Sequence, residues 1–414
     1  MTDSKEGQIP FNLILKIVLF EKGFFDMKKI LFFPLLRMQS GHHQVADALM
    51  DMVRGRNEEY EIKKIDLISY WHPGLEKMLS RSYLNWIRLF PNSYNFIYSK
   101  RYCTANQPKK FYENHFLKKM EQLIELEKPD AIVCTHGFPS CLISRLKMQG
   151  KCEVPVINAY TDFFINGIWA KEGIDLHFVP SKEVKEHLIR EFGIPRKHII
   201  VTGIPVHEEI KKGTSRNKRN DRPHILVAGG NSGLGGISSL TTELKKHPEF
   251  QFYILCGNNK KLYDEIHGWK EAHIKPLSYI SSRTEMDKLY DKMDAIITKP
   301  GGVTISEALR KKLPIIVHSH LPGQEKINLD YLKKHNLVVE LSKEMPIESQ
   351  LNAILNDSQI LESCARSIEC YEDEIELELT SQLHEVFKWL LGNGRTIQPA
   401  YEYSPTLQWE MVRG

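Results

Sequence analysis

Short apolar segments alternate with helical segments along most of this 414-residue chain. Buried strands of a parallel sheet read as short apolar runs, and each is followed by a helix that covers the sheet. We predict strands at 30–36, 60–67, 131–134, 154–160, 176–180 and 199–201, and again at 225–228, 252–256, 273–277, 295–298, 313–318 and 337–341. The alternation predicts an α/β fold with mostly parallel sheets, and it is interrupted between the sixth and the seventh predicted strand.

The interruption is residues 207–222, which are polar, basic and poor in apolar side chains. We interpret this segment as a linker between two Rossmann-like domains, residues 27–206 and 223–392. A chain of this length with 42% hydrophobic residues can form two cores of ordinary size. Residues 1–26 are predicted to be an N-terminal extension, and residues 393–414 a weakly ordered tail.

Residues 293–328 contain two strand-to-loop turns, the places where open α/β sheets bind ligands. Glycines ahead of a helix N-terminus let backbone N–H groups approach an anion, and carboxylates accept hydrogen bonds from hydroxyls. This predicts a nucleotide-sugar, with its phosphates at two glycines and a threonine and its hydroxyls at three longer side chains. The residues concerned are Gly301, Gly302, Thr304, Glu307, Gln324 and Glu325.

Thr304 and Glu307 also have the spacing of a helix capping box, in which each side chain satisfies an N–H of the first turn. A helix opening at Thr304 without any ligand is the alternative interpretation. A second glycine-rich turn, at Gly229, Gly230 and Gly233, follows the first strand of the second domain.

The first domain offers two candidate catalytic residues. His42 lies in the turn after the first strand, and an imidazole with a pKa near 7 can take the proton of a hydroxyl. Alternatively, His42 only caps a helix that begins near Gln44. Asp162 follows a strand, where its carboxylate orients the acceptor or His42, or closes an Asx turn.

Residues 81–118 break the alternation with ten aromatic residues, seven Lys or Arg, and one acidic residue. Aromatic rings and cations together suit the interface of an anionic membrane. The residues expected to meet membrane or acceptor are Trp86, Lys100, Arg101, Lys109 and Lys110. The alternative is that the aromatic rings pack inside the domain. Single-stranded nucleic acid uses similar chemistry, but no RNA-binding signature accompanies the segment.

The composition of the chain bears on its partners, its cellular location and its metal content. The formal net charge is only +4, which gives no general argument for a nucleic-acid partner. Seven cysteines form no C-x-x-C pair, so we expect reduced thiols, a cytoplasmic location and no zinc site. An apolar run at 9–20 is interrupted by Asn12 and Lys16 and is shorter than the roughly 20 residues that span a bilayer.

Five motifs together resemble a known family. They are GHHQVADAL (41–49), TDFFINGIW (161–169), VTGIPV (201–206), GGxxG (229–233), and KPGGVTISEAL with PGQE (299–325). This set is similar to the monogalactosyldiacylglycerol synthases and bacterial processive diacylglycerol glucosyltransferases, which are related to the glycosyltransferase of lipid II synthesis. The resemblance covers about residues 28–385 and implies the GT-B architecture, in which two Rossmann-like domains face each other across a cleft.

The resemblance also implies roles for single residues. Gly301, Gly302 and Thr304 would hold the donor diphosphate, Glu307 the ribose, and Gln324 and Glu325 the sugar hydroxyls. The glycines at 229, 230 and 233 would form a second loop near the donor, with the uracil near residues 279–282. His42 matches the histidine of the family's N-terminal turn.

These points predict an inverting glycosyltransferase that moves a hexose from a UDP-sugar to a lipid, most simply diacylglycerol. We expect a peripheral enzyme on the inner face of the cell membrane, with no metal and no cofactor, because helix N-termini would stabilise the leaving diphosphate. Two enzyme alternatives are a UDP-N-acetylglucosamine 2-epimerase and a lipid II-type N-acetylglucosaminyltransferase.

One departure from the family motivates a third alternative. Asn166 stands where close bacterial members carry a histidine, and an amide cannot act as a general base. A non-catalytic protein that binds a UDP-sugar and regulates a partner would tolerate this change.

Overall fold

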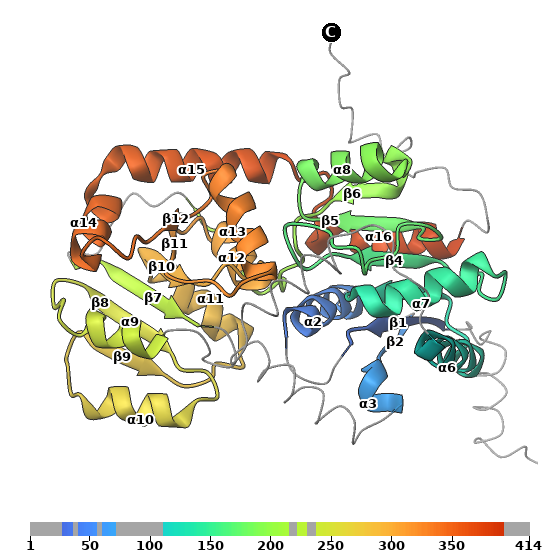
Figure 1. Ribbon diagram of the computed structural model, residues 1–414, viewed down its shortest axis with the longest axis horizontal. Helices are drawn as coiled ribbons and strands as arrows, with labels where there is room; N and C mark the ends of the chain where they lie inside the picture. Colours follow the sequence, from blue (N-terminus) through green and yellow to red (C-terminus); the bar gives the residue numbers. More distant parts are fainter. Residues whose placement is uncertain are drawn as a thin grey trace, which may run out of the picture.

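The computed structural model describes residues 27–35, 40–55, 60–71, 111–214, 222–229 and 237–392. The predicted N-terminal extension, the segment up to residue 110 that carries the proposed membrane contacts, part of the linker and the tail lie outside these residues. Figure 1 shows two domains side by side, each built on one sheet with helices on both of its faces.

The first domain holds a six-stranded parallel sheet in the order β2-β1-β3-β4-β5-β6. Its strands are β1 (Lys28–Phe33), β2 (Tyr60–Lys64), β3 (Ala131–Cys134), β4 (Val156–Ala159), β5 (Leu176–Val179) and β6 (Ile199–Val201). Its helices are α2 (Gly41–Arg54), α3 (Leu67–Trp71), α6 (Phe111–Glu127), α7 (Gly137–Met148), α8 (Lys182–Phe192) and the 3-10 turn η1 (Arg196–His198).

The second domain repeats this plan, with a parallel sheet in the order β12-β11-β10-β7-β8-β9. Its strands are β7 (His224–Ala228), β8 (Gln251–Leu255), β9 (Ile274–Leu277), β10 (Ala295–Thr298), β11 (Ile315–Val317) and β12 (Val339–Glu340). The helices that follow β7 are α9 (Ile237–Leu244), α10 (Lys260–Gly268), α11 (Arg283–Asp291), α12 (Gly302–Arg310), α13 (Gln324–Lys334), α14 (Ile347–Asn356), α15 (Ser358–Asp373) and α16 (Leu379–Gly392).

The predicted fold class is therefore confirmed, with strands in every predicted position. Several strands are shorter than predicted, because apolar residues that flank a hydrogen-bonded ladder are buried as well. The two helix starts near the site were predicted too late. One helix begins at Gly41 instead of Gln44, and the other at Gly302 instead of Thr304.

Side-chain alternation on β1 shows how each sheet builds two cores. Ile30 and Phe32 belong to one buried cluster, and Leu31 and Phe33 to the cluster on the opposite face. All four are fully buried, and each contributes roughly 1.5–3 kcal/mol relative to an exposed side chain. The first cluster also contains Val303, so one core continues through the domain interface.

The chain crosses between the domains twice, and Arg310 at the end of α12 contacts both crossings. Its Nε donates to Ile210 O at 2.7 Å in the first crossing, and its Nη1 lies 3.3 Å from Glu378 Oε1 in the second. After the second crossing, α16 packs against α2 of the first domain, and Figure 1 shows it beside that domain's sheet. The ring of Phe387 lies 6.3 Å from that of Tyr60.

In the part of the chain that the structure describes, every helix is too short or too polar to span a bilayer.

Candidate functional site

His42 is the second residue of α2, so its backbone is helical. The N-cap position belongs to Ser40, whose backbone is extended, and the interpretation of His42 as a simple cap is wrong. Residues Val45, Leu49 and Met52 bury the inner face of the helix against the sheet, which fixes where its first turn lies. The imidazole is thereby held at the carboxyl end of the first sheet.

Two threonines hold the imidazole in one orientation. His42 Nδ1 lies 2.8 Å from Thr135 O and 2.9 Å from Thr161 Oγ1. Thr135 Oγ1 donates in return to His42 O at 2.9 Å. Because a carbonyl oxygen only accepts, Nδ1 carries the proton and Nε2 keeps its lone pair. Among the described residues, no hydrogen-bond partner is found for Nε2.

Burial lowers the pKa of His42 to about 4, and the neighbouring His43 adds to the effect while the bond to Thr135 opposes it. This corrects the expected pKa near 7. The ring is neutral at physiological pH, as a general base must be before it acts. A base with a low pKa is weaker, so the transition state needs added stabilisation of the imidazolium.

Asp162 supplies a link to that imidazolium. The Thr161 side chain, whose Oγ1 lies 2.9 Å from His42 Nδ1, also lowers the pKa of the neighbouring Asp162 and so favours its ionised form. Burial outweighs this and raises the pKa of Asp162 above its ordinary value. The carboxyl group therefore reaches His42 through Thr161, the residue that precedes it in the chain.

Asp162 also joins the two domains. Its Oδ1 accepts from Asn328 Nδ2 at 2.9 Å, and its Oδ2 from Gln324 Nε2 at 2.5 Å. Asn328 is fixed in turn by Pro300 O at 3.1 Å and by the N–H of Phe163 at 2.9 Å. A network of buried hydrogen bonds thus ties the first domain to the start of α13 in the second.

The start of α12 faces the start of α2. A Cβ added to Gly41 would lie 3.5 Å from Val303, and one added to Gly302 would lie 2.0 Å from Thr161 O. Gly302 must therefore be glycine because the domains touch there. A Cβ on Gly301 would meet nothing within 4 Å. Gly301, the N-cap of α12, therefore has open space beside it, whereas Gly302 does not.

Among the described residues, no side chain caps α12, and its N-cap is Gly301. The predicted capping box is therefore wrong, since Thr304 lies inside the helix and Glu307 turns away from the N-terminus. Uncapped N–H groups and the helix dipole make this end suitable for an anion.

Glu307 is buried and points toward α11. Its Oε2 accepts from Tyr290 Oη at 2.8 Å, and its Oε1 lies 4.0 Å from Arg283 Nη1. Burial raises the pKa of Glu307, while Tyr290 and Arg283 oppose the shift. A role in ribose binding stays a prediction.

Gln324 and Glu325 are the first two residues of α13, which follows Gly323 with φ 86°. Only glycine adopts that backbone readily, and the turn brings Gln324 to the domain interface. Gln324 binds Asp162 as described above. Glu325 Oε2 accepts from Leu321 N at 2.5 Å, and its Oε1 lies 3.7 Å from Lys299 Nζ. Their proposed contacts to sugar hydroxyls stay predictions.

The remaining predicted site residues are placed only in part. Gly229 is buried directly after β7, at the carboxyl end of the second sheet. Two further glycines of its loop and all five predicted membrane residues lie outside the described residues: Gly230, Gly233, Trp86, Lys100, Arg101, Lys109 and Lys110. In the region predicted for uracil, Tyr279 is exposed and Ser282 caps α11 by accepting from Glu285 N at 3.2 Å.

Asn166 shapes a loop of the first domain. Its Oδ1 accepts from Ile168 N at 3.0 Å, and its backbone oxygen accepts from Lys171 Nζ at 3.0 Å. The same Nζ binds Trp169 O at 2.7 Å. The amide is therefore used in holding the turn.

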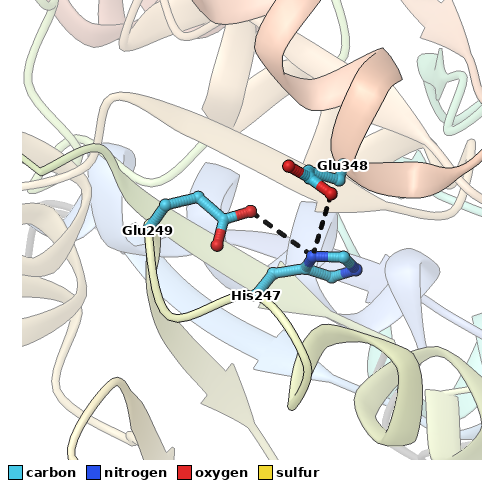
Figure 2. A group of neighbouring side chains, drawn as sticks. All are labelled: His247, Glu249 and Glu348. Carbon is cyan, nitrogen blue, oxygen red and sulfur yellow. Dashed lines mark ion pairs between the residues drawn. The ribbon is translucent and has the colours of Figure 1, made fainter.

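One cluster of side chains among the described residues has the composition of a metal site and shares no residue with the site above. Figure 2 shows Glu249 and Glu348 on the same side of His247, with Nδ1 3.3 Å from one carboxylate and 3.9 Å from the other. All three belong to the second domain, and both glutamates are exposed. Ion pairing to the imidazole accounts for this arrangement, and we assign it no role in the site.

Sequence reasoning missed Thr135, Thr161, His136 and Asn328. The ring of His136 lies 4.7 Å from that of His42, nearly perpendicular to it. Asn328 had a usable signal, since it lies four positions after Gln324 and so on the same face of α13. The threonines act by contacts between segments far apart in the chain, which leave no local pattern.

Comparison with known proteins fits this geometry. Residues 42–206 match the family model described as monogalactosyldiacylglycerol (MGDG) synthase, and residues 224–355 match the glycosyltransferase family 28 C-terminal domain. An uncharacterized glycosyltransferase, YkoN, of Bacillus subtilis (strain 168) is 41% identical over 76% of this chain and 84% of its own. A processive diacylglycerol beta-glucosyltransferase of Bacillus cereus (strain AH187) is 29% identical over 78% and 84%.

Solved structures support the fold. MurG of Acinetobacter baumannii superposes with a TM-score of 0.55 at 14% identity, covering 87% of this chain and 99% of that one. The glycosyltransferase SnogD of Streptomyces nogalater gives 0.52 at 13% identity, covering 88% and 99%. The two-domain architecture is thus the GT-B fold. The chain is a glycosyltransferase and belongs to the monogalactosyldiacylglycerol synthase family.

Proposed function

We propose that this glycosyltransferase moves a hexose from a UDP-sugar to the hydroxyl of a lipid, most simply diacylglycerol, with inversion at the anomeric carbon. The observation that carries the proposal is that His42, held through Nδ1, lies in the first turn of α2, which faces the uncapped start of α12. A base and an anion-binding helix end are the two groups that such a transfer requires. The similarity to a diacylglycerol glucosyltransferase supports the lipid acceptor.

The reaction follows from these two groups. His42 Nε2 takes the proton of the acceptor hydroxyl as its oxygen attacks the anomeric carbon from the face opposite UDP. The bond between that carbon and the diphosphate oxygen breaks, and UDP leaves with the electron pair. Backbone N–H groups at Gly302 and Val303 face the developing charge on the diphosphate. The proton on His42 then passes to solvent.

The hydrogen bonds around His42 support the charged intermediate. As the ring gains its second proton, Nδ1–H donates more strongly to Thr135 O, and Thr161 connects it to the Asp162 carboxyl. Asp162 is held by Gln324, whose remaining groups we place at the hexose hydroxyls with Glu325. Base orientation and sugar binding are thereby joined through one carboxyl group.

A divalent metal is not needed in this scheme, because the helix end takes the role of a cation. Full activity in excess chelator is the expected result, and restoration by Mg²⁺ or Mn²⁺ of activity lost to chelator would contradict it.

The direct test supplies UDP-glucose, UDP-galactose and UDP-N-acetylglucosamine in turn over diacylglycerol vesicles and identifies the lipid product by mass. A hexosyl-diacylglycerol with equimolar UDP is expected. Transfer only to an undecaprenyl-linked acceptor would favour the lipid II-type alternative, and a new UDP-sugar without UDP would favour an epimerase.

We further propose that residues 81–118 dock the enzyme on the anionic inner face of the cell membrane. Reversing the charge of Lys100, Arg101, Lys109 and Lys110 should abolish sedimentation with anionic vesicles. A matched control reverses four lysines of the second domain that are exposed: Lys260, Lys261, Lys270 and Lys292. Binding that survives the first set, or falls equally with the second, contradicts this assignment.

A further inference from the structure

His136 stands beside the proposed base but was assigned no role above. It follows β3 and is the N-cap of α7, where its Nδ1 accepts from Phe138 N at 3.0 Å. Its ring is partly buried and lies 4.7 Å from the ring of His42 at 77°. The two histidines therefore occupy one corner of the domain interface.

The hydrogen bonds give the two rings opposite tautomers. Since Nδ1 of His136 accepts an amide proton, that nitrogen carries none, and the single proton of the neutral ring is on Nε2. His42 is the reverse, with its proton on Nδ1. Burial, followed by the effect of His42, lowers the pKa of His136 well below its ordinary value, so the ring stays neutral. One ring thus offers an acceptor nitrogen and the other a donor N–H.

We propose that His136 binds the acceptor substrate by donating its Nε2–H to a second oxygen, adjacent to the hydroxyl that His42 deprotonates. Among the described residues, no hydrogen-bond partner is found for either Nε2 atom. The pair selects alcohols with oxygens on neighbouring carbons, as in a glycerol lipid, where an ester oxygen stands next to the free hydroxyl. This inference rests on the proposed function and adds a specificity residue to it.

A His136→Asn variant separates this role from helix capping. Asparagine is a good N-cap whose side-chain oxygen replaces Nδ1 at Phe138 N, while its shorter amide removes the Nε2–H donor. His267→Asn, at an exposed histidine in α10, is the matched control. Thermal unfolding of both variants should match the unsubstituted protein.

Kinetics give the first readout. His136→Asn should raise the KM for diacylglycerol about tenfold, the size expected for one hydrogen bond. The KM for the UDP-sugar and the slow hydrolysis of the donor by water should not change, because water has no second oxygen. For a long-chain primary alcohol, the transfer rate should also be unchanged. An equal loss of transfer and hydrolysis would overturn the proposal, since it would mean that His136 acts only through His42.

Nitrogen NMR gives a readout that does not depend on the acceptor. Spectra of the imidazole nitrogens at pH 7 should show the proton of His136 on Nε2 and that of His42 on Nδ1. A charged ring or the opposite tautomer at His136 would overturn the proposal. Failure of the enzyme to glycosylate any glycerol lipid would instead contradict the proposed function, and the KM comparison would then be made with the alcohol that it does glycosylate.

Discussion

The two sides of the domain interface are built differently. On the first-domain side, His42, Thr135 and Thr161 hold one another by hydrogen bonds between side chains and backbone. On the second-domain side, Gly301 and Gly323 are the N-caps of α12 and α13, and no described side chain caps either helix. Helices α8, α10, α11 and α15, in contrast, are capped by Ser181, Asn259, Ser282 and Asp357.

This difference suggests a division of roles, with proton transfer on the first-domain side and anion binding on the second-domain side. Fixed side chains suit the handling of a proton, which requires a defined lone pair at a defined place. Uncapped helix ends suit the binding of negative charge, which requires N–H groups that no side chain already occupies. The following four changes test that division, in order of decreasing expected effect.

Replacing the base should have the largest effect. His42→Ala should lower kcat by about 10²–10⁴-fold, the range for general base catalysis, and leave the affinity for UDP within about twofold. Transfer assays and calorimetric titration with UDP measure the two quantities, with His267→Ala as the exposed control. A large loss of UDP affinity would place His42 on the donor side and end the division proposed here.

The two glycines of α12 should respond differently to a methyl group. Gly302→Ala puts Cβ 2.0 Å from Thr161 O and should destabilise the folded protein by about 1–3 kcal/mol, as overpacking does. Gly301→Ala has open space and a φ of −87°, so its unfolding free energy should change by less than about 0.5 kcal/mol. Chemical denaturation of both variants without ligand checks this, and equal destabilisation would contradict the contact.

Removing Asn328, which links the two sides of the interface, should have an intermediate effect on stability and on activity. Asn328→Ala removes the buried donor to Asp162 Oδ1 and leaves the N–H of Phe163 without its acceptor, at a cost of about 1–3 kcal/mol, while Gln324 still donates to Asp162 Oδ2. Asn352→Ala, on α14, is the control. Because Asp162 reaches both His42 and Gln324, kcat should fall and the KM for the donor should rise in the same variant. A change in only one of the two parameters would show that the sides act independently.

Lowering the pH to 5 should have the smallest effect on the protonation state of His42. With a pKa of about 4, the neutral fraction of His42 at pH 5 stays near 90%, whereas a histidine of ordinary pKa would retain about 3%. An NMR titration of the His42 ring should find its midpoint near pH 4. Since this folded-state pKa lies below the ordinary value, protonation favours unfolding. The stability that the neutral ring contributes is complete above pH 6.5 and is lost as pH falls toward 4. A midpoint above pH 6 would contradict the buried geometry.

The sequence was sufficient to predict both sheets, because apolar runs of strand length recur with helices between them. It also located the glycine turn at Gly301 and Gly302, since glycines before a helix form a local pattern. It did not distinguish the two glycines. The contact that makes Gly302 obligatory comes from Thr161, which lies in the other domain.

The hydrogen-bond partners of the candidate catalytic residues were not predictable for a related reason. Thr135 lies 93 positions from His42, and Asn328 lies 166 positions from Asp162. The low pKa of His42 likewise comes from burial, which the sequence around it does not show. Residue type identified the candidates, whereas tertiary packing decided what surrounds them.

Helix α12 has a further consequence through its two ends. Its first turn lies where we place the diphosphate, and its last residue, Arg310, contacts both segments that cross between the domains. At 1.5 Å per residue, the nine residues of α12 form a helix about 13 Å long. If a bound donor displaced α12, Arg310 would move with the helix, and so would its contacts to the two segments that connect the domains.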